Sequence, residues 1–317
     1  MPPLARALRG ALSARRLTCA QLATGLLFVL PAWRSGFRST PLVDRSLLLR
    51  FLPIALLHAS GHMTQVLSMG LGSVYFTHVI KAAEPFIGTL VVLAFTGKIA
   101  PWYVNLCLSP VVGGVAYAAA KPGAAFDISD LWSAPAAAAL FSTVAFAIAK
   151  LLAKNLMTKD LKRERGLDAA NTYALLTCCS ASVLLLPAVA TEGASAAATA
   201  AALDAAARVD LAKRLLTCGG FYYAYNEMGF RVLDLLGPVS QAVANSAKRV
   251  VILFAAVIFL GEKVSYRKFV GSAVAIGGVT LYSLAKAVAA DVKKEAPKKK
   301  VVIELTEQVD AAGTWQP

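Results

Sequence analysis

The sequence predicts an all-α bundle of membrane-spanning helices, and three observations support that prediction. Of the 317 residues, 57% are hydrophobic and only 16% are charged, whereas a soluble chain of this size would carry about 25% charged residues. The mean hydropathy is +0.62. The apolar residues gather in stretches of roughly 20, the length that one helix needs to cross a bilayer. This composition is typical of a polytopic membrane protein.

The net charge of +14 comes mainly from loops and tails. Basic residues in those places indicate membrane topology rather than nucleic-acid binding. The cysteines lie in apolar stretches and none pairs at CxxC spacing, so we expect neither a disulfide framework nor a metal site, and no cofactor. The five are Cys19, Cys107, Cys178, Cys179 and Cys218.

The chain begins with a basic segment, residues 1–16, that holds four arginines and no acid. Such a bias is typical of organelle targeting sequences. The apolar stretch 17–33 that follows could be the core of a signal peptide or the first span, and we favour the span.

Eight further apolar segments follow, separated by Gly-rich or charged breaks such as Gly70 and Gly72. Lys150 and Lys154 sit at the basic end of one segment, and the hydrophilic run 159–165 is expected to be a loop. The alanine-rich stretch 194–207 is expected to be an interfacial helix or loop. The predicted membrane domain is 17–287, and the lysine-rich tail 288–317 is predicted to be disordered. The eight segments are 47–69, 73–97, 100–120, 131–156, 169–190, 211–236, 237–261 and 266–285.

An internal repeat relates the two halves of the domain, about 17–120 and 131–287. The matching spans are five apart, and an odd number of spans means that the copies cross in opposite directions. Such inverted-topology repeats build many secondary transporters, with the substrate site at the repeat interface near the midplane. A shift of 164 residues places Gly97 on Gly261, Gly113-Gly114 on Gly277-Gly278, and Lys81 on Asn245.

Nine spans do not divide into two equal halves, and ten would. In a nine-span arrangement the basic N-terminus also falls on the opposite side from the basic loops and tail. One further span ahead of residue 17 would correct both features. We therefore predict that this chain lacks a first span, through a truncated gene model or genuine loss, which sequencing the full transcript would decide.

Lys248 and Arg249 lie together near the middle of the span 237–261, with no acid in the same span. A charge at the bilayer centre costs roughly 2.5–3.5 kcal/mol. About twelve residues separate the pair from either end, which is too deep for snorkelling. The pair therefore predicts a water-accessible pocket that receives an anion.

Lys81 lies in the middle of the span that repeats as the Lys248-Arg249 span. Glu84, three residues on, could neutralise it as a structural pair. However, Pro85 loosens the helix at this point. We therefore expect Lys81 to be an anion ligand.

The histidines all lie in the spans 47–69 and 73–97. His58 and His62 share a helix face, but only Glu84 could join them as an acidic metal ligand, so a metal pair is not favoured. His62 is expected to line the polar cavity as a neutral, hydrogen-bonding group. For His58 and His78, hydrogen bonding between helices is as good an interpretation as a functional role.

Three stretches carry a resemblance to a known family: FTHVIKAAEPF (76–86), YAYN (223–226), and NSAKRVVILFAAVIFLGEKVSYRKFVGSAVAIGGVTLYS (245–283). Over residues 47–287 the chain resembles the plastid phosphate translocators of the drug/metabolite transporter superfamily. The resemblance implies a ten-helix inverted-repeat carrier of the plastid inner envelope or of a complex-plastid membrane. It implies exchange of inorganic phosphate for triose phosphate, 3-phosphoglycerate, phosphoenolpyruvate or pentose and hexose phosphates.

The resemblance also implies site residues. A hydroxyl residue of the family corresponds to Thr64 or Gln65, a choice that stays open, and Gln65 would replace the hydroxyl. The other implied ligands are the phosphate-holding Lys81, Lys248 and Arg249, His62 and Tyr225 near the carbon part of the substrate, and Asn245 just before the cations.

With the site empty, closure would bury about three unpaired cations, so only the anion-filled carrier is expected to rock between its faces. No nucleophile and base are paired, so no enzymatic activity is expected. A nucleotide-sugar carrier of the Golgi or endoplasmic reticulum is the nearest alternative. A membrane enzyme acting on lipid phosphates and a non-transporting membrane protein are the others. Apart from its small-molecule substrates, the chain is expected to contact the lipid bilayer and no nucleic acid. The sequence does not determine the oligomeric state.

Overall fold

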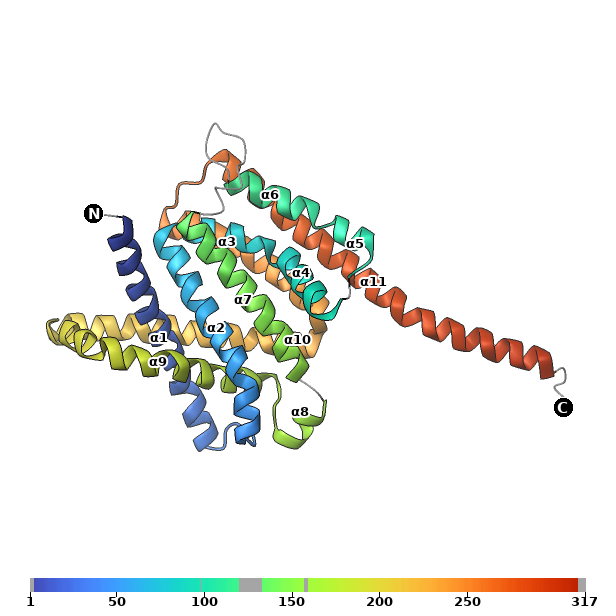
Figure 1. Ribbon diagram of the computed structural model, residues 1–317, viewed down its shortest axis with the longest axis horizontal. Coiled ribbons are helices and arrows are strands. Elements are labelled where there is room, and N and C mark those ends of the chain that lie inside the picture. The colour runs from blue at the N-terminus through green and yellow to red at the C-terminus, as the bar shows by residue number, and fades with distance from the viewer. Residues whose placement is uncertain (1–2, 98, 120–132, 157–158, 313–317) are drawn as a thin grey trace.

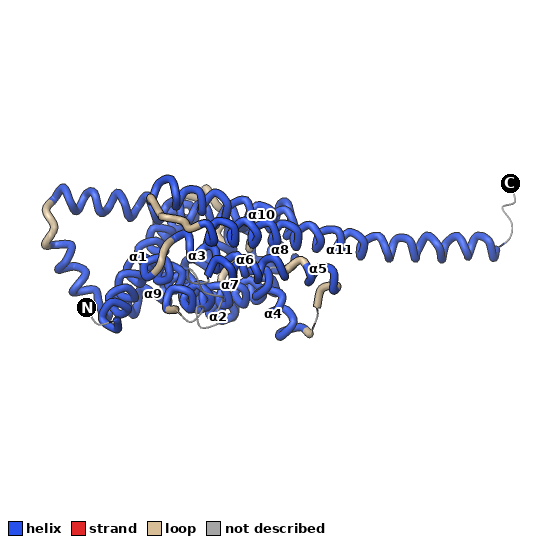
Figure 2. Tube along the Cα trace, turned by 90° about the horizontal axis from the view of Figure 1, so that it is seen from above, coloured by secondary structure: helices blue, strands red, loops and turns tan. Residues whose placement is uncertain are grey.

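The structure is a computed structural model that describes residues 3–97, 99–119, 133–156 and 159–312. These residues form a bundle of helices joined by short connections, and the last helix projects away from it (Figures 1 and 2). The helices are α1 (Pro3–Arg34), α2 (Arg45–Leu71), α3 (Val74–Ile80), the 3-10 turn η1 (Lys81–Ala83), α4 (Glu84–Thr96), α5 (Trp102–Leu106), α6 (Ser109–Ala119), α7 (Ala134–Leu156), α8 (Lys159–Arg165), α9 (Ala169–Ala201), α10 (Ala205–Leu260) and α11 (Tyr266–Ala312).

Within the described residues, six helical segments are long and apolar enough to cross a membrane, so the chain is a multi-pass membrane protein, as predicted. The predicted spans in α2 and in the first part of α10 include more polar or charged residues. The side chains in the first half of the predicted span 237–261 fall outside the described residues. The six segments are Ala14–Arg34, Val74–Thr96, Trp102–Ala119, Ala134–Ala153, Ala169–Thr191 and Tyr266–Ala289.

The helix α10 contains both of the predicted spans 211–236 and 237–261. Tyr225 and Lys248 are 23 residues apart on this helix, and their side chains touch. A straight helix would separate them by roughly 34 Å. The helix must therefore bend sharply between them, and Figure 1 shows it doubling back. The bent stretch includes Gly237 and Pro238, the residue types that break helices.

The predicted repeat has a geometric counterpart where α6 crosses α11. Gly97 ends α4 and Gly261 ends α10, both in the left-handed conformation that glycine favours, with φ of 64° and 63°. A Cβ on Gly114 would lie 2.5 Å from the backbone nitrogen of Ala275.

The matching glycine in α11 is equally close: a Cβ on Gly278 would lie 2.8 Å from the backbone nitrogen of Val111. The shift of 164 converts each of these contacts into the other, because it carries Val111 to Ala275 and Gly114 to Gly278. Such exchange of partners is the signature of two-fold symmetry.

The core lies where α1, α2, α9 and the first part of α10 pack together around Tyr173, which is fully buried. Connections are held down by polar contacts: Arg38 donates to Glu227 at 2.7 Å. Asp44 caps α2 by accepting from the Leu47 backbone N–H at 2.7 Å, and it pairs with Arg165 at 2.8 Å. These two contacts hold the pKa of Asp44 below its usual range.

Two segments expected to be irregular are helical, and a third, for which helix and loop were both open, is helical as well. The predicted loop 159–165 forms α8, and most of the alanine-rich stretch 194–207 extends α9 to Ala201. The tail, predicted to be disordered, instead prolongs α11 as far as Ala312. The reason is that alanine, lysine and glutamate favour helix, and that lengthening an existing helix needs no new nucleus. The last residue of the predicted span 100–120 and the first two residues of the predicted span 131–156 lie outside the described residues.

Candidate functional site

A broken helix places Lys81 inside the bundle. Pro85 has no N–H to give to the carbonyl of Lys81, four residues back, and its ring clashes with that carbonyl. The chain accordingly passes through the 3-10 turn η1 between α3 and α4. Lys81 begins this turn and is only 7% exposed. Interrupted helices of this kind line substrate sites in secondary transporters.

One face of α7 lies against this break. Lys81 Nζ donates a hydrogen bond to Ser142 Oγ at 3.0 Å and lies 4.8 Å from the centre of the Phe146 ring. Ser142, Phe146 and Lys150 are four residues apart, so they form one stripe of α7. The stripe therefore supplies a hydroxyl, an aromatic face and a second lysine to the same region.

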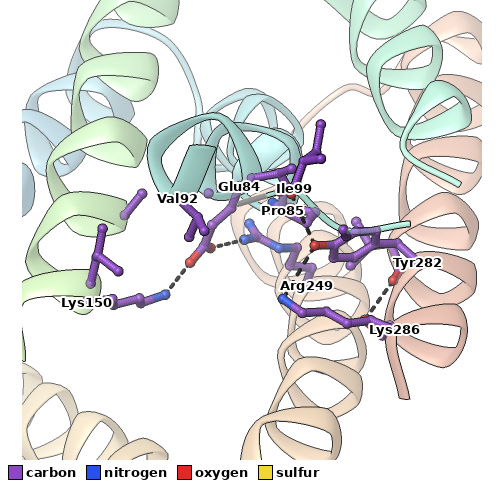
Figure 3. A pocket seen from close by; sticks show the side chains of 15 residues that line it. Glu84, Pro85, Val92, Ile99, Lys150, Arg249, Tyr282 and Lys286 are labelled. Carbon is purple, nitrogen blue, oxygen red and sulfur yellow. Dashed lines mark hydrogen bonds and ion pairs between the residues drawn. The ribbon is translucent and has the colours of Figure 1, made fainter. Parts of the chain in front are cut away.

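Glu84 joins the two repeat halves through charge. Arg249 Nη2 donates to Glu84 Oε2 at 2.5 Å, and Lys150 pairs with Oε1 of the same carboxylate (Figure 3). The sequence suggested Glu84 as a neutralising partner for Lys81. The structure pairs it with Arg249 and Lys150 instead, although Lys81 lies within electrostatic range of all three.

Lys248 and Arg249 are neighbours in sequence but have different partners. Arg249 is 6% exposed and reaches Glu84, whereas Lys248 contacts the hydroxyl of Tyr225 and lies 4.5 Å from the centre of its ring. The sharp bend in α10 makes this second contact, because Tyr225 belongs to the part of α10 before the bend. Tyr225 is half-buried.

Lys150 and Arg249 thus contact Glu84, and Lys81 and Lys248 lie within electrostatic range of the same carboxylate. The group carries three positive charges more than negative. Arginine offers a planar fork to two oxygens of one anion, and lysines act as point charges. Such a group suits a multiply charged oxyanion.

His62 is buried nearby and is fixed from two sides. Its Nε2 donates to Gln21 Oε1 at 2.9 Å, and its ring stacks on Tyr222 with centroids 4.3 Å apart. Thr64 donates to the carbonyls of Ser60 and Gly61 in its own helix, at 2.9 and 3.2 Å.

The remaining histidines and the predicted asparagine lie as follows. His58 Nδ1 lies 3.1 Å from Ser180 Oγ of α9, so its expected hydrogen bond between helices is confirmed. The Nδ1 atom of His78 is buried without a hydrogen bond within the described part of the chain. Asn245 lies in α10, and its side chain falls outside the described residues.

A cavity of about 490 Å³ opens beside the charged group, between α4, α7, α10 and α11. Its volume falls in the range of small-molecule sites, roughly 300–1,000 Å³. Glu84, Lys150 and Arg249 form one part of its wall, and Tyr282 and Lys286 of α11 form another (Figure 3).

Residues 9–283 match the sequence model of the Triose-phosphate Transporter family. The chain belongs to the triose-phosphate transporter family. Membership of this transporter family agrees with the multi-pass membrane architecture.

Relatives in this transporter family are identical to the chain at about a third of the aligned positions. The phosphoenolpyruvate/phosphate translocator 1 of Oryza sativa subsp. japonica is 33% identical over 85% of this chain and 64% of its own. The triose phosphate/phosphate translocators of Pisum sativum and Spinacia oleracea are 32% and 33% identical, over 87% and 86% of this chain and 66% and 65% of their own. All three are described as chloroplastic, and the chain spans less than two thirds of their length.

A solved crystal structure covers 90% of this transporter chain and 94% of its own, with a TM-score of 0.53 and 14% identity. At that identity the likeness concerns the fold alone.

Sequence reasoning missed Lys150 and its stripe on α7. That reasoning interpreted Lys150 as part of the basic end of a span, yet the residue reaches the partly buried Glu84 carboxylate. The signal that could have found it is the four-residue spacing from Ser142 through Phe146 to Lys150. Gln21, which holds His62, carried no comparable signal.

Proposed function

We propose that this chain is an antiporter that exchanges inorganic phosphate for a phosphorylated C3 to C6 metabolite, with triose phosphate and 3-phosphoglycerate favoured. The exchange would cross a plastid envelope membrane by alternating access. The observation that supports it most is the convergence of Lys81 from one repeat half with Lys248 and Arg249 from the other. The names of the relatives, chloroplast translocators of phosphate with phosphorylated metabolites, agree with it.

In this proposal the phosphate group is held by Lys81, Lys248 and Arg249, while His62 and Tyr225 approach the carbon part. Lys150, which shares the Glu84 carboxylate with Arg249, adds a fourth positive charge beside the phosphate.

For the open choice in α2 we favour Gln65. The hydroxyl of Thr64 is already used by its own helix, whereas Gln65 lies three residues from His62 and on the same face. Asn245 is retained on the resemblance alone.

Glu84 gives the empty carrier a partial counterion. Without substrate it shields Arg249 and Lys150, yet three positive charges remain in excess, and Lys81 and Arg249 are buried. Burying charges without partners costs several kcal/mol each. A phosphate dianion removes most of the excess and competes with Glu84 for the Arg249 guanidinium. Reorientation is therefore favourable only with an anion bound, which enforces exchange rather than one-way flow.

The test is phosphate counter-exchange in proteoliposomes that contain purified Lys248→Ala or Arg249→Ala protein. Each replacement removes a ligand of the proposed phosphate site, and exchange should fall to background. Lys213→Ala, an exposed lysine outside the site, is the matched control and should leave exchange unchanged. Near-normal exchange by both site variants would remove the assignment.

A further inference from the structure

The wall of the cavity formed by α11 and the outer part of α4 carries a second polar group. Tyr282 and Lys286 line the same cavity as Glu84, Lys150 and Arg249 (Figure 3). Thr89 lines it as well. If the function proposed above holds, this second group helps to select which phosphorylated compound the carrier transports.

Hydrogen-bond directions in the second group follow from its contacts. Thr89 Oγ1 donates to the Pro85 carbonyl at 2.9 Å, so its single hydrogen is used. The Tyr282 hydroxyl, 3.1 Å away, must therefore donate to Thr89 Oγ1. Lys286 Nζ in turn donates to the Tyr282 oxygen at 3.5 Å and lies 5.5 Å from the centre of its ring. These contacts hold the Lys286 ammonium at the wall of the cavity.

Lys286 keeps donors for a ligand. An ammonium group carries three N–H donors, and the contact with Tyr282 uses one of them. Tyr282 is buried and so provides a fixed support, whereas Lys286 is exposed at the cavity. No carboxylate is paired with Lys286 among the described contacts, unlike Arg249 and Lys150, which share Glu84.

The separation of the two groups exceeds the size of one phosphate. Glu84 and Thr89 are five residues apart on α4, or roughly 7.5 Å along the axis. Gly88 lies between them on the cavity wall, and a Cβ built on it would meet no atom within 4 Å. The cavity is therefore open from one group toward the other, over a length that suits a short phosphorylated metabolite.

We propose that Lys286, supported by Tyr282 and Thr89, forms a second anion subsite that receives the second anionic group of a phosphorylated substrate. That group is a carboxylate or a second phosphate, while the first phosphate lies at Arg249, the proposed phosphate ligand that lines this cavity. The subsite favours substrates with two anionic ends over phosphate esters whose carbon part is uncharged.

The experiment compares three substrates in counter-exchange against internal phosphate. Inorganic phosphate has no carbon part, dihydroxyacetone phosphate has an uncharged one, and 3-phosphoglycerate carries a carboxylate. In Lys286→Gln protein we expect the KM for 3-phosphoglycerate to rise about tenfold. The KM values for the other two should stay within about twofold of those of the unchanged protein.

Tyr282→Phe is the second variant. It keeps the ring volume but removes the hydroxyl that orients Lys286, so it should raise the KM for 3-phosphoglycerate by a smaller factor. Lys213→Gln is the matched control, because it removes an exposed lysine that lies near the start of α10 and does not line the cavity. It should change none of the three values.

Two outcomes would overturn the subsite: equal KM changes for all three substrates in Lys286→Gln protein, or no change for any of them. Both are distinguishable from failure of the proposed function, because in that case the unchanged protein would itself exchange none of the three compounds.

Discussion

Glu84 is the carboxylate that neutralises cations beside the cavity, within the described residues. Replacing it by glutamine frees Arg249 and Lys150 from their counterion and adds one positive charge to the empty site. We expect the KM for phosphate to fall by roughly tenfold, about 1.4 kcal/mol, and the maximal exchange rate to fall as well, because release becomes slower. Initial rates of labelled-phosphate exchange at graded concentrations measure both quantities.

Glu164→Gln is the control for this variant, since it removes an exposed acid from α8. A higher KM in Glu84→Gln protein would contradict the counterion role. It would mean that the carboxylate is needed to hold Arg249 in place for the phosphate.

At the scale of single residues, burial cost separates what could be predicted from what could not. Lys81, Lys248 and Arg249 could be identified as candidate ligands, because a cation in the middle of a span is costly unless it has a functional role. Lys150 was not, because a lysine toward the end of an apolar run has the same pattern whether it snorkels or turns inward. Which way α7 faces is decided by its packing on α2 and α4, and the sequence of α7 alone does not contain that information.

At the scale of helices, the crossing of α6 and α11 is held by glycines that leave no room for a side chain. Gly114→Ala and Gly278→Ala each place a Cβ within 2.5 to 2.8 Å of backbone atoms of the other helix. Because backbone cannot rotate away as a side chain can, the helices must separate. We expect both variants to lower the midpoint of thermal unfolding in detergent by several degrees, which corresponds to about 1–3 kcal/mol.

The neighbouring glycines are matched controls. A Cβ on Gly113 or Gly277 meets no atom within 4 Å, so Gly113→Ala and Gly277→Ala should be neutral or stabilising, since alanine favours helix by up to about 1 kcal/mol. Equal effects at all four positions would show that the crossing does not depend on close approach of the two backbones.

The glycine pairs also show how far the elements were predictable. The repeat of Gly113-Gly114 and Gly277-Gly278 indicated related helices, but not that the two copies contact each other. The spans 211–236 and 237–261 were predicted as separate crossings, and the contact of Lys248 with Tyr225 requires a bend in α10 between them. The tail was predicted to be disordered, but α11 continues through it to Ala312. The prediction interpreted low hydropathy as disorder, although the residues themselves favour helix.

At the scale of the whole molecule, the charged group borders the cavity, and at the end where α3 begins, polar contacts join the two repeat halves. We call these contacts the seal. Glu262 accepts hydrogen bonds from the backbone N–H groups of Val74 and Tyr75 at 2.9 and 3.1 Å. The Tyr75 hydroxyl lies 2.9 Å from Ser272 Oγ of α11. In the proposed alternating access, this end opens when the cavity end closes.

Glu262→Ala removes both acceptors from the start of α3 and should therefore increase the population that is open at that end. Ala256 is 1% exposed and packs with Tyr75 behind the seal, so a cysteine there, in protein whose native cysteines are replaced by alanine, reports the opening. We expect a water-soluble maleimide to label Ala256→Cys several times faster with Glu262→Ala than without it. Glu262→Gln keeps one acceptor oxygen and should give an intermediate rate. Equal rates in all three proteins would mean that packing around Tyr75 and Ala256, rather than the Glu262 carboxylate, keeps this end closed.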